Sequence, residues 1–179
     1  MTQTNPKQLW IKNLEHRSLV YCMLSLIVGK NTIWFKIGEA GKQGGNSYYR
    51  MHHLLGKSTP MYKAMLLTNI WEPPSDKTPQ QYESLLIKNI DVWGKNTNNC
   101  KLITNNSKEF FSTNNESCNK VSKFIEEEAK RLNFIPQPVL FRTAYQVDKA
   151  WNCKKNSKPY YGSFQITRSL INEVKERNY

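Results

Sequence analysis

Two apolar runs near the start of the chain predict a β-hairpin. Residues 17–28 (RSLVYCMLSLIV) and 32–38 (TIWFKIG) are rich in β-branched and aromatic side chains, and Gly29-Lys30-Asn31 separates them. Such runs on either side of a short glycine-containing turn are typical of paired antiparallel strands. Residues 61–71 (MYKAMLLTNIW) fit either a buried strand or a short helix by their periodicity, and we favour a third strand.

Helix signals follow both of these regions. Asn46 or Ser47 is suited to cap a helix on which Arg50 and His53, three residues apart, lie on neighbouring faces. Residues 78–81 (TPQQ) combine a capping threonine, a proline at the first helical position and a glutamine that completes a capping box. An apolar stripe with Glu83 beside it continues this second helix; it consists of Tyr82, Leu85, Leu86 and Ile90.

The second half of the chain predicts an addition to this core. Residues 100–113 (CKLI, a turn-prone TNNSK, then EFFST) fit a short hairpin or an irregular loop, and a second amphipathic helix follows from Asn115. Beyond 135 come two possible strands and a basic terminal helix. We therefore predict an α+β fold, with a small, mainly antiparallel three-stranded sheet flanked by helices in residues 1–113 and a C-terminal α/β addition in residues 114–179.

The charge of the chain favours a polyanionic partner. Lysine and arginine number 26 against 14 acidic residues, which gives a net charge of +12, and 12% of the residues are aromatic. Basic side chains neutralise phosphates and aromatic rings stack on bases, so nucleic acid suits this composition, although a merely basic soluble protein has it too. The basic residues are too dispersed for one face of a membrane-surface helix.

Other classes of protein fit the sequence less well. No apolar run reaches the roughly 18 to 20 residues that span a bilayer, and the N-terminus lacks the order of a secretory signal. Cysteines 22, 100, 118 and 153 are too far apart for a zinc knuckle, which indicates reduced thiols in the cytoplasm. GKST at 56–59 is no P-loop, because Met51 stands where a glycine is required.

The order of several short motifs resembles that of the GIY-YIG nuclease superfamily. LVY at 19–21 takes the place of GIY, and KIG at 36–38 takes the place of YIG. Arg50 matches the family's helix arginine, and Glu83 matches its metal-binding glutamate. KEFF at 108–111 is similar to the signature that closes the core in the phage-associated branch. Lysine replaces the tyrosine of the second motif, as in some restriction enzymes of the superfamily, and the loop between the two motifs is longer than the family's compact spacing.

The resemblance implies a phosphodiester-hydrolysing site. Tyr21, assisted by a neighbouring Lys36 ammonium, would activate water, because a nearby cation favours the phenolate. Arg50 would hold the scissile phosphate, and Glu83 would bind one Mg²⁺ (or Mn²⁺). His53 is a candidate proton shuttle.

The expected function is a type II restriction enzyme that cuts double-stranded DNA as a homodimer. Two alternatives remain open: a nucleic-acid-binding module without cleavage, and a phage homing or repair nuclease. Two groups of residues are candidate DNA contacts. Lys42 and Tyr49 lie in and after the glycine-rich turn at 38–45 (GEAGKQGG), and the C-terminal addition contributes Arg142, Lys149, Lys154, Lys155, Lys158 and Arg168.

Overall fold

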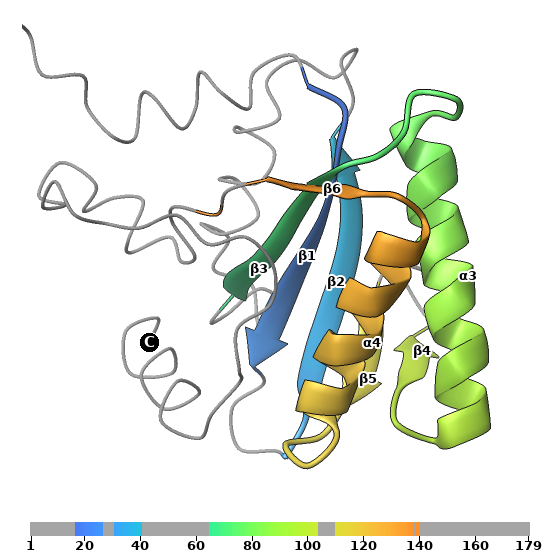
Figure 1. The fold of residues 1–179 in the computed structure, drawn as a ribbon. Helices are drawn as coiled ribbons and strands as arrows, with labels where there is room; N and C mark the ends of the chain where they lie inside the picture. The colour runs from blue at the N-terminus through green and yellow to red at the C-terminus, as the bar shows by residue number, and fades with distance from the viewer. Residues whose placement is uncertain (1–16, 27–30, 41–64, 104–109, 138, 140–179) are drawn as a thin grey trace, which may run out of the picture.

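The computed structural model describes residues 17–26, 31–40, 65–103, 110–137 and 139. This part of the chain forms an α+β fold with two helices and one antiparallel sheet (Figure 1). The predicted fold class and the antiparallel sheet are confirmed, but the described sheet has six strands where three were predicted. The elements are β1 (Leu19–Leu26), β2 (Ile33–Ala40), β3 (Met65–Glu72), α3 (Pro79–Thr97), β4 (Lys101–Ile103), β5 (Phe110–Thr113), α4 (Cys118–Arg131) and β6 (Ile135–Gln137).

The predicted hairpin and third strand form the centre of the sheet. The strand order is β4-β5-β2-β1-β3-β6, so β1 lies between β2 and β3 and pairs with both in antiparallel fashion. Its register with β2 runs from Leu19 opposite Ala40 to Leu26 opposite Ile33. The pairing with β3 shifts between Cys22 and Met23, which marks a β-bulge.

Three short strands extend this centre on both sides. The predicted hairpin of β4 and β5 is confirmed, and β5 adds to the free edge of β2. β6 was not predicted, because prolines at positions 136 and 138 argue against a strand. A proline is tolerated in an edge strand, where a missing N–H leaves no inner ladder incomplete, and β6 pairs with β3 at the edge of the described sheet.

Helix α3 begins at the predicted capping box. The Thr78 side chain accepts a hydrogen bond from the Gln81 N–H at 3.1 Å, and the Gln81 side chain accepts one from the Thr78 N–H at 2.9 Å. The helix ends at Asn98, whose backbone is left-handed with φ of 59°. Both ends are thus determined by local sequence.

Helix α4 begins at Cys118, three residues after the predicted start. Asn114 accounts for the delay, because its side-chain oxygen accepts hydrogen bonds from the N–H groups of Glu116 and Ser117 and holds these residues in a turn. None of the described helices is long and apolar enough to cross a membrane.

The hydrophobic core lies between one face of the sheet and the two helices, which lie together on that face (Figure 1). Side chains alternate between the two faces along a strand. The core-facing members include Val20, Cys22 and Leu24 of β1, Phe35 and Ile37 of β2, Trp71 of β3, Leu86 and Ile90 of α3, Phe111 of β5, and Val121 and Ile125 of α4.

Candidate functional site

Tyr21 and Lys36 lie on the same face of the sheet, opposite the face that packs on the helices. The neighbours of each along its strand belong to the helix-facing core, so alternation places both on the other face. Tyr21 pairs directly with Gly38, and Lys36 pairs with Met23, which makes Tyr21 and Lys36 diagonal neighbours across two paired strands. The expectation that the two side chains come from paired strands is confirmed.

The Tyr21 ring packs directly against Gly38. A Cβ atom at position 38 would lie 2.7 Å from Cε2 of the ring and closer still to Cζ and Oη. A side chain there would displace the ring, so glycine at the last position of KIG lets the last residue of LVY adopt this position without strain. The two motifs therefore meet in space through their final residues.

Lys36 is 4% exposed, and its ammonium lies over an aromatic ring. The Nζ atom is 5.0 Å from the centroid of Phe110, the residue opposite Lys36 on β5. Phe111, the next residue, faces the helices instead and pairs with Phe35. The side chains of the two phenylalanines of the KEFF motif thus lie on opposite faces of the sheet.

Glu83 lies on the buried side of α3 and is 8% exposed. It occupies the second turn of the helix, near the end of the sheet where β1 begins and β2 ends, because α3 follows β3 directly and β3 runs antiparallel to β1. Tyr21 belongs to this same end of the sheet but to the opposite face. A site that uses Tyr21, Lys36 and Glu83 together must extend around the end of β2.

Several predicted site residues lie outside the described residues. They are Arg50 and His53 of the catalytic set and Lys42, Tyr49, Arg142, Lys149, Lys154, Lys155, Lys158 and Arg168 of the DNA-contacting set. Their roles stay predictions.

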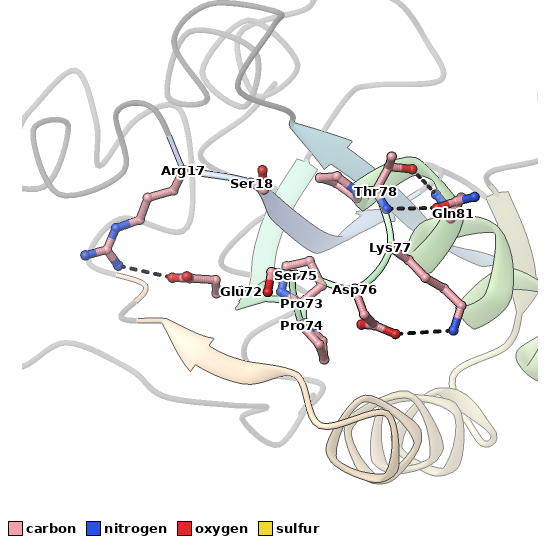
Figure 2. Close-up of a pocket in the computed structure, with 11 residues that line it drawn as sticks. Arg17, Ser18, Glu72, Pro73, Pro74, Ser75, Asp76, Lys77, Thr78 and Gln81 are labelled. Carbon is pink, nitrogen blue, oxygen red and sulfur yellow. Dashed lines mark hydrogen bonds and ion pairs between the residues drawn. The ribbon is translucent and has the colours of Figure 1, made fainter.

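A pocket of about 660 Å³ opens at the start of α3 (Figure 2). Its walls are the residues that precede β1, the end of β3 and the loop from Pro73 to Thr78. Arg17 lies 3.6 Å from the Glu72 carboxylate and donates a hydrogen bond of 2.8 Å to the Gln137 side chain, so it connects β3 and β6 at this end of the sheet.

The charges around the pocket occur in pairs. Asp76 accepts a hydrogen bond from the Tyr82 hydroxyl and lies 3.6 Å from the Lys77 ammonium, which in turn lies over the Tyr82 ring. The Tyr82 hydrogen bond lowers the pKa of Asp76, and the same bond raises the pKa of Tyr82. The sequence EPPSDK at 72–77 gives no indication of which of its charges pair.

Glu83 is the described residue to which the resemblance assigns a divalent cation. The described residues contain no group of three or more histidine, cysteine or acidic side chains that could hold a metal, so a cation would take a single protein carboxylate together with phosphate and water oxygens. The three described thiols are poor ligands, because burial raises the pKa of Cys22 to about 12 and that of Cys100 to about 11, and also raises that of Cys118.

No protein-family model matches the chain, and no curated protein or solved structure matches it either. The resemblance to the GIY-YIG superfamily therefore rests on the sequence motifs, and membership in that family stays a prediction.

Proposed function

We propose that the chain is a metal-dependent endonuclease with a GIY-YIG-type site that hydrolyses phosphodiester bonds of double-stranded DNA. The observation that carries this proposal is the contact between Tyr21 and Gly38, with Lys36 buried on the same face. Two motifs defined by sequence order alone converge in space, and the residue that departs from the family pattern lies beside the tyrosine that it would assist.

Each described residue has a distinct task in the proposed reaction. The Lys36 ammonium favours the phenolate form of Tyr21, which accepts a proton from the attacking water. Glu83 is the ligand that would hold Mg²⁺ or Mn²⁺, and the ion supplies positive charge for the leaving oxygen. A carboxylate oxygen fits this hard cation.

Two residues outside the described part complete the proposed site. Arg50 holds the scissile phosphate, because its planar guanidinium can donate two parallel hydrogen bonds to phosphate oxygens. His53 passes a proton at the same phosphate, since histidine titrates near neutral pH.

Site-specific cutting by a cytoplasmic type II restriction enzyme is the form of this activity that we favour. The net charge of +12 supports a DNA partner. A homodimer would place two sites in symmetry-related positions and cut both strands of a palindromic sequence.

Plasmid nicking in the presence of Mg²⁺ tests the proposal. We expect Glu83→Gln to lower the cutting rate by at least about 100-fold, while Glu127→Gln, which changes an exposed glutamate on α4, leaves the rate unchanged. Circular dichroism and thermal unfolding are the controls that test whether both variants fold. Undiminished cutting by Glu83→Gln would overturn the metal assignment, and a wild-type protein that cuts no DNA would favour the binding module.

The products separate the restriction enzyme from a homing or repair nuclease. A restriction enzyme gives a discrete limit digest on genomic DNA, and sequencing of the ends gives the site and the stagger. Cutting that depends on a rare long site or on damaged DNA would contradict the restriction assignment. Analytical ultracentrifugation with and without DNA measures the proposed dimer.

A further inference from the structure

Lys36 is almost completely buried, which is rare for a lysine. Water solvates an ammonium strongly, so a side chain with 4% exposure needs groups in the protein that replace that solvation. Phe110 is one such group, because the face of its ring carries partial negative charge. We propose that Phe110 is a positioning residue that holds the Lys36 ammonium on the Tyr21 face of the sheet; this role in catalysis rests on the proposed function.

The strand register brings the ring and the ammonium together. Phe110 pairs directly with Lys36 across β2 and β5, so both side chains lie on the same face of the sheet. Nζ is 5.0 Å from the ring centroid, within the range of about 6 Å for a cation–π contact. Phe110 is itself only 2% exposed, and an interaction with little competing water is stronger than one at the surface.

A second aromatic side chain fixes the ring. Trp34 lies two residues before Lys36 on β2 and therefore on the same face. Its ring meets that of Phe110 edge to face, with centroids 5.8 Å apart and planes inclined by 61°. The pairing of β5 with β2 fixes the backbone of Phe110, and the contact with Trp34 fixes the orientation of its ring. The ring face next to the ammonium is therefore in a defined position.

An aromatic ring holds a cation without bringing a formal negative charge to it. A carboxylate at position 110 would pair with the ammonium and offset its field at neighbouring groups. A phenylalanine attracts the ammonium through its quadrupole and itself adds no negative charge that would offset the field of the ammonium at the diagonal neighbour Tyr21. This is what a cation that assists a phenolate requires.

The chain provides a matched control one residue away. Phe111 is the next residue of β5 and is fully buried, but its side chain lies on the helix-facing side of the sheet. Lys36 lies on the other side. Phe110→Leu and Phe111→Leu are therefore the same change in the same strand on opposite faces. Phe110→Tyr keeps the ring and serves as the conservative variant.

Nuclear magnetic resonance tests the contact without any enzyme assay. An aromatic face shifts nearby protons upfield, so we expect the ε-methylene protons of Lys36, assigned with Lys36→Arg, to lie upfield in the wild-type protein and in Phe110→Tyr. They should return toward the ordinary lysine position in Phe110→Leu and stay upfield in Phe111→Leu. Chemical shifts of the Lys36 ε-methylene protons that stay unchanged in Phe110→Leu would overturn the proposal.

The nicking rate then tests the consequence for catalysis. We expect Phe110→Leu to reduce the rate by about tenfold, Phe110→Tyr to restore it, and Phe111→Leu to retain the wild-type rate wherever the protein is folded. Equal losses in Phe110→Leu and Phe111→Leu would show a merely structural role and overturn the positioning role. A wild-type protein that cuts no DNA refutes the proposed function and this catalytic role with it, while the resonance shifts still decide whether Phe110 holds Lys36.

Discussion

Tyr21 and Gly38 are direct partners in the central strand pair, and the tyrosine ring occupies the space that any side chain at position 38 would need. Tyr21 is fully buried. The contact therefore restricts both motifs at once, because any side chain at position 38 would force the tyrosine ring or the strand to shift. The preference for glycine at the third position of KIG thus has a physical reason, the space taken by the Tyr21 ring, which is independent of any family resemblance.

Replacement of this glycine measures how tightly the ring is held. We expect Gly38→Ala to lower the free energy of unfolding by about 1 to 3 kcal/mol, because the added Cβ forces the ring or β2 to shift. Urea denaturation followed by tryptophan fluorescence measures the loss. In a Tyr21→Ala background the clash is absent, so the same change should cost much less there. Equal costs in the two backgrounds would show that the ring does not fill this space.

Removal of one hydroxyl tests the proposed role of Tyr21. We expect Tyr21→Phe to keep the ring contact with Gly38 and the fold, yet to lower the nicking rate by about 100-fold or more, since it removes the group that would accept the proton. Tyr82→Phe is the control, because it removes a hydroxyl that bonds to Asp76 on the other side of the sheet. Tyr82→Phe should cut at the wild-type rate. A Tyr21→Phe protein that also cuts normally would rule out the phenolate.

The sequence predicted features that depend on local order. The central hairpin followed from two apolar runs and a glycine turn, and the start of α3 followed from Thr78, Pro79 and Gln81, whose capping bonds form within four residues. Glu83 was placed beside the apolar stripe and is indeed buried there.

Features that depend on pairing between distant segments were not predicted. The contact of Lys36 with Phe110 requires the register of two strands about 70 residues apart, and no local pattern encodes that register. The separation of Glu83 from Tyr21 by the thickness of the sheet depends on which face α3 covers. β6 was missed because the pairing of an edge strand can tolerate proline, while sequence rules count proline against any strand.

A buried glutamate between the helices predicts a change in stability with pH. Glu128 accepts hydrogen bonds from Arg131 of α4 and, at 2.7 Å, from Asn89 of α3. These bonds, that from Arg131 above all, lower the pKa of Glu128. Because the folded-state pKa is lowered, the ionised Glu128 contributes fully to the free energy of unfolding above the pKa of an unfolded glutamate, about 4.3. This contribution is lost as the pH falls through the folded-state pKa.

We therefore expect Glu128→Gln to cost roughly 1 kcal/mol at pH 7 and progressively less as the pH falls through the folded-state pKa of Glu128, because below that pKa both proteins carry a neutral side chain. The figure is modest because Arg131 is mostly exposed to water. Urea denaturation at a series of pH values measures the difference. Glu127→Gln, which changes a side chain that is 64% exposed, should change the dependence of stability on pH little. A difference in the free energy of unfolding that does not shrink as the pH falls below about 4.3 would contradict the ionised hydrogen bonds.

The buried thiols predict resistance to alkylation. Burial raises the pKa of Cys22 to about 12 and that of Cys100 to about 11, and it also raises that of Cys118. The thiolate is the reactive form, and at pH 8 only a small fraction of each of these cysteines is present as thiolate. Alkylation is therefore slow even where a reagent reaches the sulfur. In a Cys153→Ser variant, whose remaining cysteines are these three, we expect slow labelling by iodoacetamide when the protein is folded and complete labelling in guanidinium chloride. Mass spectrometry of the peptides identifies each site, and rapid labelling of Cys22 in the folded protein would mean that the centre of the sheet opens to solvent.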